Sequence, residues 1–417
     1  MKKLKSLARR TVRKLKGMLP ETPPTPPPSS IVLTVVEEAQ VLPRVADALA
    51  GPLAGPGVIG PVIERAVVGE TEARGALGDS GGVDVPGWAH GANGVLRSAV
   101  DLVRVRDVWH APAFGAVFDD QGQVFKSAVH EALYLTPTLA ALPDTRREGD
   151  ETLFTPPVDA PEIARATVFM AWGGLHNYGH FLIDCLSALM AAKQVGALQS
   201  HPPVAPPLLS WQRELLDLML GGEAAAPEII EARVARLGEA VFATPMDHFL
   251  HAPGPPLDAV RERILASAAI TDDPAAPKRI YVSRLGSLKR ELVNEVELEA
   301  ALSARGFAIV RPETLSVREQ IALFHHAETV VAPAGAALAN VLFCKPGTKV
   351  VEIQPSNFIG VWVRNIALLT GADWRALFAP SPLSETEILM EGQLRPASEF
   401  RWRLDLDGFL AFLDAAL

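Results

Sequence analysis

The sequence is poor in features that mark several common protein classes. Only two cysteines occur in 417 residues, and Cys185 and Cys344 both lie inside apolar runs. Such a chain is not a secreted scaffold held by disulfides, and we expect two buried thiols. Neither the P-loop pattern G-x-x-x-x-G-K-[ST] nor the dinucleotide pattern G-x-G-x-x-G occurs after residue 273. His90, His110 and His130 are scattered without metal-ligand spacing, so we expect ordinary surface or packing histidines.

Acidic and basic residues are distributed unevenly along the chain. The net charge is -9, yet residues 1–17 carry eight cations and no acid, so the remainder must carry -9 - 8 = -17. This acidic body excludes nucleic acid as a partner by bulk charge. Residues 1–19 also place leucines at helical spacing, which predicts a basic amphipathic helix suited to an anionic membrane surface. The alternative is a disordered basic tail that only improves solubility.

Composition divides the chain into four segments. Residues 1–30 hold the basic tail, which lacks the apolar core of a signal peptide or transmembrane segment, and a stiff Pro-rich linker. The rest is long enough for two domains, which we expect at residues 31–272 and 273–385, because residues 271–278 are polar and Pro-rich. We expect residues 386–417 to form a C-terminal helical segment, in which Asp405 caps a helix with an apolar stripe of Leu406, Phe409, Leu410 and Leu413. Residues 51–95 lack periodicity and receive no assignment.

Strand-like and helix-like segments alternate regularly from Arg279 onward. The expected strands are 280–283, 307–310, 329–332 and 348–353. The expected helices are 294–306, 316–326, 336–343 and 361–369. Asn294 with Glu297, and Ser316 with Glu319, are the residue pairs that cap helix N-termini. This alternation predicts an α/β fold with a doubly wound parallel sheet.

The central feature of the sequence is a glycine-rich loop followed by a helix, at residues 173–184. An apolar run at 166–171 favours a strand before the loop, and residues 181–192 are long enough for a helix after it. Because His180 and Asp184 are four residues apart, they share one face of that helix. A His–carboxylate pair in apolar surroundings is a candidate proton acceptor. The alternative is a pair that only caps and packs the helix.

Three segments would lie at the carboxyl ends of the C-terminal strands, where ligands bind in an open α/β sheet. Arg284 and Arg290, with Asn294, suit phosphate oxygens because guanidinium binds them through two hydrogen bonds. Glu352 suits ribose hydroxyls. The third segment is a loop of small residues that lets a ligand approach the backbone and a helix N-terminus: Gly335, Ala336, Ala337, Leu338, Ala339 and Asn340. Together they predict a nucleotide-diphosphate cleft, and the alternatives are a solvated charged face and tight turn packing.

Several of these motifs occur in the order found in one family. Residues 177–184 resemble the first signature of the glycosyltransferase 61 family. The resemblance extends to residues 281–284 with Arg290, to 294–297, to 335–340 and to 351–353, and so spans about residues 165–375. It does not include the basic tail, and the first 150 residues match only loosely.

The resemblance implies a GT-B architecture, in which two Rossmann-like domains face a cleft and the C-terminal helix often crosses back to the N-terminal domain. It implies inverting transfer of a sugar from a nucleotide-sugar donor to a hydroxyl of a glycan or glycolipid acceptor. By this resemblance, Arg284, Arg290 and residues 335–340 would hold the donor diphosphate. His180 and Asp184 would line the cleft from the opposite domain, with Asn177 and Tyr178 on the acceptor side.

The basic tail and the lack of a signal anchor lead us to expect a bacterial family member. We expect it to act in surface-polysaccharide (capsule) biosynthesis, in the cytoplasm, and peripherally at the inner face of the membrane through residues 1–19.

The expected mechanism is a single displacement at the anomeric carbon. His180 takes the proton of the acceptor hydroxyl and Asp184 orients the ring, although the two roles are interchangeable at this point. Arg284, Arg290 and the loop amides stabilise the departing diphosphate, so we expect neither a metal nor a cofactor beyond the nucleotide sugar. Two alternatives remain. His-x-x-x-Asp is also an acyltransferase spacing, although those families usually have Gly where Cys185 stands, and a non-catalytic scaffold would bind nucleotide sugar or glycan without turnover.

Overall fold

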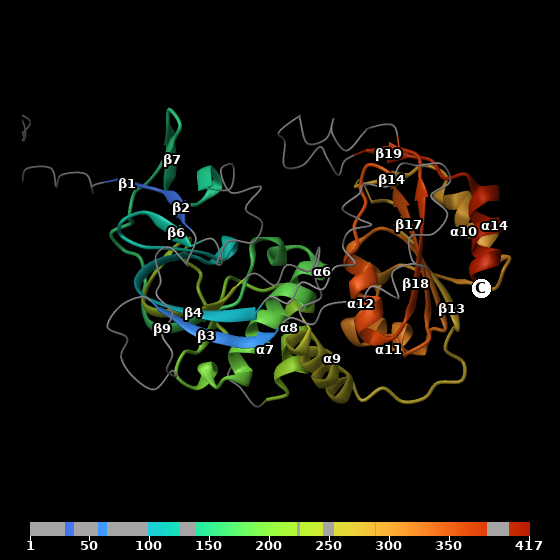
Figure 1. The fold of residues 1–417 in the computed structure, drawn as a ribbon, viewed down its shortest axis with the longest axis horizontal. Coiled ribbons are helices and arrows are strands. Elements are labelled where there is room, and N and C mark those ends of the chain that lie inside the picture. Colours follow the sequence, from blue (N-terminus) through green and yellow to red (C-terminus); the bar gives the residue numbers. More distant parts are fainter. Residues whose placement is uncertain are drawn as a thin grey trace, which may run out of the picture.

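The computed structural model describes residues 30–36, 57–64, 99–125, 139–222, 226–244, 254–287, 289–381 and 400–417. The predicted basic helix, the Pro-rich linker, His90 and His130 lie outside these residues. Figure 1 shows an N-terminal half, residues 30–268, beside a C-terminal half, residues 279–417. The domain limits drawn from the sequence remain predictions.

The described part of the N-terminal half is built on a mixed sheet in the order β11-β10-β9-β12-β4-β5-β6-β2, with β3 also paired to β4. Its strands are β2 (Thr34–Val36), β3 (Gly57–Glu64), β4 (Ala99–Ala111), β5 (Ala116–Phe118), β6 (Gln123–Phe125), β9 (Glu162–Val168), β10 (Pro203–Ala205), β11 (Glu228–Ile229) and β12 (Ala235–Ala243). The strands β9 to β12 pair in parallel, whereas β4 runs antiparallel to β12, β3 and β5. The resemblance implies a Rossmann-like N-terminal half; the strands β9 to β12 form a parallel part of this kind, and the antiparallel strands lie beside it, so the GT-B arrangement stays a prediction.

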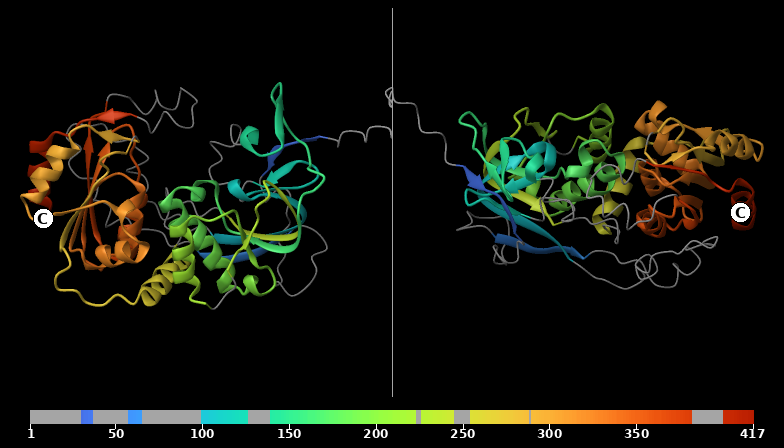
Figure 2. Two further views of the ribbon diagram at one scale, coloured as in Figure 1. Left: turned by 180° about the vertical axis from the view of Figure 1, so that it is seen from behind. Right: turned by 90° about the horizontal axis from the view of Figure 1, so that it is seen from above.

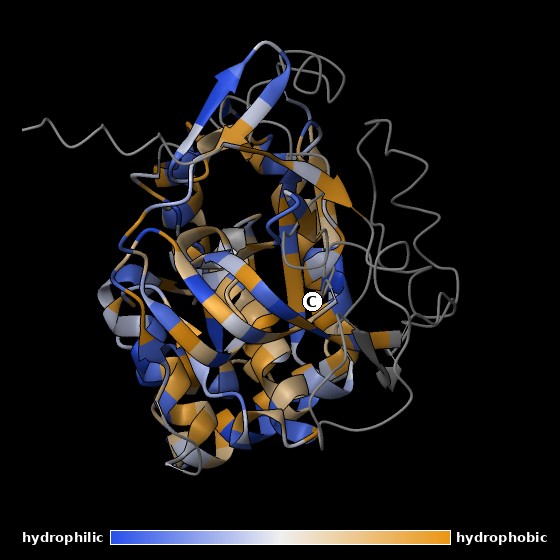
Figure 3. Cartoon of the chain, turned by 90° about the vertical axis from the view of Figure 1, so that its left-hand side faces the viewer, coloured by the Kyte–Doolittle hydropathy of each residue, from blue (hydrophilic) through white to orange (hydrophobic). Residues whose placement is uncertain are grey.

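A second, small sheet joins β1 (Ile31–Val32), β8 (Glu151–Phe154) and β7 (Thr145–Glu148). Its β7–β8 hairpin projects from the sheet, and Figure 3 shows hydrophilic residues along β7. A turn at residues 119–122 joins β5 to β6, which pair antiparallel at Phe118 and Val124. Helical elements of this half are η1 (Pro112–Phe114), η4 (Trp172–Leu175), α6 (Tyr178–His180), η5 (Phe181–Cys185), α7 (Leu186–Gln194), η6 (Ala197–Gln199), α8 (Ser210–Leu220) and α9 (Pro255–Ala268).

The C-terminal half confirms the predicted doubly wound sheet. Its described strands are all parallel, in the order β15-β13-β16-β17-β18. Their bounds are β13 (Arg279–Val282), β15 (Ala308–Val310), β16 (Thr329–Pro333), β17 (Lys349–Pro355) and β18 (Asp373–Ala379). The chain therefore reverses its direction of winding between β13 and β16, and ligands bind at the carboxyl ends of strands beside such a point.

Helices cover both faces of this sheet (Figures 1 and 2). One face, turned toward the N-terminal half, carries α11 (Val317–His326) and α12 (Trp362–Thr370). The opposite face carries α10 (Glu295–Ser303) and α14 (Leu406–Ala416). Shorter elements are β14 (Glu291–Leu292), η7 (Pro312–Thr314), η8 (Ala336–Phe343) and β19 (Arg401–Trp402).

The terminal helix α14 corrects the expectation that it crosses back. Phe409 and Leu413 are buried in one cluster with Leu298 and Leu302 of α10, on the C-terminal sheet. The apolar face of α14 is thus buried against its own half of the molecule. As predicted, Asp405 caps α14, since its side chain accepts a hydrogen bond from the backbone of Gly408.

The two expected helix caps of the C-terminal half have different outcomes. Ser316 and Glu319 form the predicted reciprocal pair at the start of α11. Asn294 does not cap α10 with its side chain, because its amide bonds to both backbone groups of Leu404 instead. A tertiary contact has replaced the local one.

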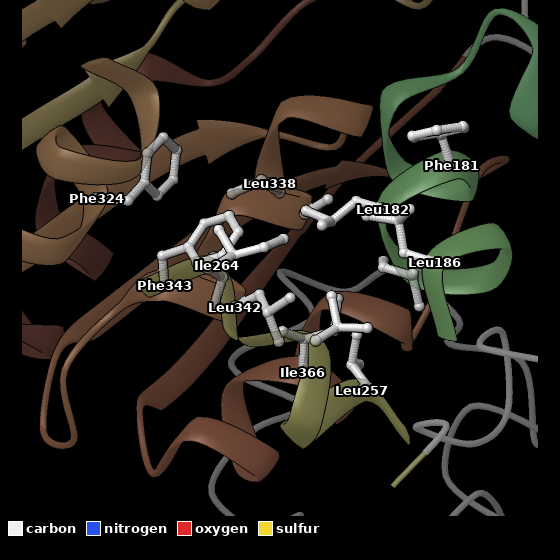
Figure 4. Close-up of a cluster of buried hydrophobic side chains, with 14 of the residues drawn as sticks. Phe181, Leu182, Leu186, Leu257, Ile264, Phe324, Leu338, Leu342, Phe343 and Ile366 are labelled. Atoms are coloured by element: carbon white, nitrogen blue, oxygen red, sulfur yellow. The ribbon is translucent and has the colours of Figure 1, made fainter. Parts of the chain in front are cut away.

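The two halves share a buried core. Apolar residues of η5, α7 and α9 belong to the same cluster as residues of η8 and α12. Figure 4 shows members from both halves, among them Leu182 and Leu186 beside Leu338 and Leu342. This packing fixes the position of α6, which lies at the junction. No described helix combines the length with the apolarity that crossing a bilayer requires.

Candidate functional site

The glycine-rich loop ends in a tightly defined helix start. The side chain of Asn177 accepts hydrogen bonds from the backbone N–H groups of Gly179 and His180, at 2.9 and 3.3 Å. This is an N-cap, and it sets the first turn of α6 at the point where His180 stands. The helix then passes through a π turn over η5 before it continues as α7. Single π turns inside helices occur frequently at functional sites.

His180 and Asp184 form the pair that their spacing predicted. Nδ1 of His180 lies 2.9 Å from Oδ2 of Asp184. The carboxylate is almost fully buried, at 2% exposure, whereas the imidazole is 23% exposed. When Nδ1 donates its proton to Asp184, Nε2 is the ring nitrogen that can accept another. The geometry therefore suits a histidine base oriented by a buried carboxylate.

Two glycines let this helix pack closely on the preceding loop. A Cβ on Gly173 would lie 2.6 Å from the ring carbons Cγ and Cδ2 of His180, and a Cβ on Gly174 would collide with Sγ of Cys185. Gln212 of α8 holds the same loop, donating from Nε2 to the carbonyls of Gly174 and Leu175. The expectation of a buried thiol is confirmed at Cys185, whose pKa is raised by burial.

A cleft of about 690 Å³ lies between the two halves. The N-terminal half contributes His176, Tyr178, Ser210, Trp211 and Glu214 to its lining. The C-terminal half contributes residues 283–287, 312–313, 315–317, Gln320 and Ala337. These last segments follow the carboxyl ends of β13, β15 and β16, the edge at which ligands of parallel sheets bind.

Arg284 connects the cleft with the small-residue loop. Its guanidinium lies against the backbone of Gly335, where a Cβ would collide with a terminal nitrogen of Arg284. That guanidinium donates to Ser287 Oγ and to the carbonyl of Lys289, at 3.1 and 2.8 Å. Its buried Nε has no hydrogen-bond partner among the described residues. Burial lowers the pKa of Arg284, opposed by the charge of Glu295. A desolvated guanidinium with an unused donor is what an anion site requires.

Arg290 lies near Arg284, on the other side of the loop. Its Nε donates to the carbonyl of Ala334 at 3.3 Å, and its guanidinium stacks on the ring of Phe358, 4.2 Å from the centroid. Burial, followed by the positive charge of Arg284, lowers the pKa of Arg290 to about 9. Two neighbouring, poorly solvated cations favour a bound anion between or beside them.

The small-residue loop meets α6 directly. A Cβ on Gly179 would lie 3.7 Å from the carbonyl oxygen of Ala336. The hydroxyl of Tyr178 donates to Oδ1 of Asn340 at 2.7 Å, so these two predicted site residues bond to each other across the junction. Burial raises the pKa of Tyr178 far above its ordinary value, so the hydroxyl stays protonated. The helix that carries His180 is therefore tied to the predicted diphosphate loop.

Two residues expected to bind the donor are engaged elsewhere. Asn294 is 3% exposed, and its side-chain amide forms hydrogen bonds with the backbone of Leu404. Glu352 lies within β17 at 1% exposure, accepts a hydrogen bond from Trp374, and is not among the residues that line the cleft. Burial raises the pKa of Glu352 to about 7, although Trp374, Gln354 and the charge of Arg290 oppose the shift.

The structure therefore brings together part of the predicted set. Tyr178, Arg284 and Ala337 line the cleft. His180 does not line the cleft, and its ring packs over Gly173. The residue before it, Gly179, is the one that lies near Ala336.

Several other residues at the site could not be predicted from local sequence patterns. Trp211 and Glu214 lie on an ordinary amphipathic helix, and Phe358 follows a strand in a loop without a motif. Each acquires its position only through tertiary packing. Within the described ranges, no cluster of three or more His, Cys, Asp or Glu residues is placed to hold a metal ion.

Comparison with known families identifies part of the chain. Residues 178–351 match the family model described as Glycosyltransferase 61. The matched segment begins at Tyr178, contains His180, Arg284 and Arg290, and ends one residue before Glu352. The resemblance seen in the motifs is thus confirmed over this segment. No curated protein matches the chain.

Proposed function

The chain carries a glycosyltransferase 61 domain and is therefore a glycosyltransferase; on that premise we propose that it transfers a sugar from a nucleotide-sugar donor to a hydroxyl of a glycan acceptor, with inversion. The observation that carries this proposal is the contact between α6, whose His180 bonds to Asp184 of η5, and the loop 335–340 beside two desolvated arginines. Such a reaction needs a proton acceptor and a binding site for an anionic leaving group.

We assign the donor a path along the carboxyl edge of the C-terminal sheet. The nucleoside occupies the cleft, with Trp211 as an aromatic wall. The diphosphate lies beside Gly335, against the guanidinium groups of Arg284 and Arg290 and the N–H groups at the start of η8. The sugar then reaches the end of α6, near His180. This path is supported by Arg284, which contacts both the cleft and Gly335. Such a path corresponds to a GT-B arrangement of the two halves.

The reaction is a single displacement. The acceptor oxygen attacks the anomeric carbon as His180 Nε2 takes its proton, and the bond from that carbon to the diphosphate oxygen breaks. The nucleoside diphosphate leaves with the electron pair, and Arg284 and Arg290 stabilise its charge. Asp184 orients the ring and stabilises the imidazolium. The 2% exposure of Asp184 favours His180 over Asp184 as the base. The acceptor approaches from the N-terminal half, on the side of Asn177 and Tyr178.

The acceptor class and location extend the proposal. We assign the acceptor to a surface glycan or glycolipid of a bacterial cell, and the eight cations of residues 1–17 to attachment at an anionic membrane face. Sedimentation with vesicles tests this attachment directly. The full chain should bind vesicles of mixed anionic and zwitterionic lipid but not purely zwitterionic ones, and equal binding to both would contradict it.

The experiment for catalysis compares His180→Gln and Asp184→Asn with the wild type, using nucleotide release from a panel of nucleotide sugars. Loss of the base should lower turnover by about 10²- to 10⁴-fold, while binding of the nucleoside diphosphate is kept. The matched control is His201→Gln, because His201 makes a similar contact with Glu239 at 2.7 Å outside the cleft.

Three outcomes would count against the proposal. Wild-type turnover in both variants would remove the assigned base. Thermal stabilisation of the wild type by acyl-CoA alone would favour acyl transfer, and no response to any nucleotide sugar would favour a scaffold.

A further inference from the structure

A chain of polar side chains, buried except for the partly buried Tyr178, runs from the turn after β15 to the helix that carries His180. The hydroxyl of Tyr178 donates to Asn340 Oδ1 at 2.7 Å, and Asn340 Nδ2 donates to Gln320 Oε1 at 3.0 Å. Gln320 Nε2 donates in turn to the carbonyls of Pro312 and Leu315, at 2.9 and 3.3 Å. Asn340 is fully buried and Gln320 is 8% exposed. We call these three side chains and two carbonyls the relay.

The two ends of the relay come from opposite halves of the molecule, and both reach the cleft. Pro312 and Leu315 belong to the turn after β15 and line the cleft. Tyr178 is the first residue of α6, two residues before His180, and it comes from the other half of the molecule. The relay therefore links the part of the cleft that would hold the nucleoside to the proposed base.

Only one assignment of hydrogen-bond donors and acceptors gives every side chain of the relay its partners. The carbonyl oxygens of Pro312 and Leu315 can only accept, so the nitrogen of Gln320 must donate to them and its oxygen is left to accept from Asn340. The nitrogen of Asn340 therefore donates to Gln320, and its oxygen accepts from the hydroxyl of Tyr178, which burial keeps protonated. A buried network of this kind is either complete or broken, because a half-satisfied one leaves unpaired polar atoms. Movement of the turn and movement of α6 are thus coupled.

We propose that Tyr178, Asn340 and Gln320 are positioning residues that couple occupation of the cleft to the placement of α6. A nucleoside in the cleft fixes the turn at Pro312 and Leu315. The relay then holds Tyr178, and with it His180, in the position from which the base reaches the acceptor hydroxyl. The inference rests on the proposed function, and it gives Tyr178 and Asn340 a role different from contact with acceptor or diphosphate.

The test removes one oxygen atom. Tyr178→Phe keeps the ring in the cleft wall but leaves Asn340 Oδ1 without its donor. We expect the kcat for transfer to fall about 10- to 100-fold, because small misplacements of a catalytic group have effects of that size. The donor KM should stay within about twofold, since the nucleoside site is retained. Gln320→Met breaks the relay at its other end and should lower kcat by a similar factor.

A second measurement does not depend on activity. The probe is whichever of UDP, GDP, CDP and dTDP raises the melting temperature of the wild type most. Binding of that nucleotide should slow amide hydrogen exchange in residues 178–186 of the wild type, and Tyr178→Phe should abolish this slowing without abolishing binding. The control is Thr167→Val, which removes another buried hydroxyl donor, to the carbonyl of His201, away from the cleft. It should lower stability and leave kcat and exchange unchanged.

Each contrary result points to a different error. A raised acceptor KM with unchanged kcat in Tyr178→Phe would mean that the hydroxyl contacts the acceptor. Equal loss of kcat in Thr167→Val would mean that only general stability was affected. Slowed exchange that persists in Tyr178→Phe refutes the relay and leaves the proposed function intact. Failure of all four nucleotides to bind the wild type refutes the proposed function itself.

Discussion

Replacing Arg290 should make the free protein more stable and its binding of nucleotide weaker. Burial and the nearby cation of Arg284 lower the pKa of Arg290 from its ordinary 12.5 to about 9. Because the folded-state pKa is depressed, the unfolded chain holds this proton more tightly. The charged guanidinium therefore opposes folding at every pH below about 9, and this opposition fades as the pH rises from there toward 12.5.

The size of the effect follows from the same difference. At about 1.4 kcal/mol per pH unit, the lowered pKa corresponds to about 5 kcal/mol against the charged form. Arg290→Gln also loses the stack on Phe358 and the hydrogen bond to Ala334, together about 2 kcal/mol. The variant should thus be about 1–3 kcal/mol more stable than the wild type at neutral pH. Loss of charge-assisted contacts to a diphosphate should weaken nucleotide binding about 10- to 100-fold.

Urea unfolding without ligand and calorimetric titration with nucleoside diphosphates measure the two quantities. Arg375→Gln is the matched control, because Arg375 is an exposed arginine of the same sheet that contacts Asp373 at 3.4 Å. It should change stability by less than about 0.5 kcal/mol and leave nucleotide binding unchanged. The reasoning fails if Arg290→Gln unfolds at lower urea than the wild type, or if it binds nucleotide with wild-type affinity.

Three further substitutions test neighbouring parts of the site. Burial raises the pKa of Glu352 to about 7, so its favourable contribution is complete below pH 4.5 and is lost as the pH rises through 7. Glu352→Gln should therefore gain about 3 kcal/mol relative to the wild type between these pH values, measured by urea unfolding; a gain that does not vary with pH would contradict this. Trp211→Ala should weaken nucleotide binding about tenfold by calorimetry while Trp211→Phe largely retains it, and an effect confined to the acceptor KM would place the acceptor in the cleft instead. Asn294→Ala leaves both backbone groups of Leu404 without partners, so it should lower stability by about 2–4 kcal/mol without changing nucleotide affinity; a loss of affinity at wild-type stability would return Asn294 to the donor site.

Local spacing in the sequence was sufficient for the features that depend on one helix or one turn. The contact of His180 with Asp184 follows from a separation of four residues, and the pair of Ser316 with Glu319 follows from three. The parallel C-terminal sheet follows from the alternation of strands and helices, because each segment carries its own periodicity. These are short-range properties, so neighbouring residues determine them.

Contacts between segments far apart in the sequence could not be predicted from local patterns. The strand β4 pairs with β12, more than a hundred residues later, and this antiparallel contact makes the N-terminal sheet mixed. The terminal helix α14 was identified by its apolar stripe, but the stripe does not specify which surface covers it. Asn294 had the pattern of a cap, and its bond to Leu404, 110 residues away, overrode that pattern.

The sequence by itself determined which chemical groups this protein has, namely a histidine–carboxylate pair, two arginines and a loop of small residues. Only the tertiary structure decided how they meet. It joined Tyr178 to Asn340 across 162 residues and placed Trp211 opposite the turn after β15. The physical reason is that burial of an apolar core shared by both halves fixes these contacts, and the energy of that core depends on the whole chain rather than on any one segment.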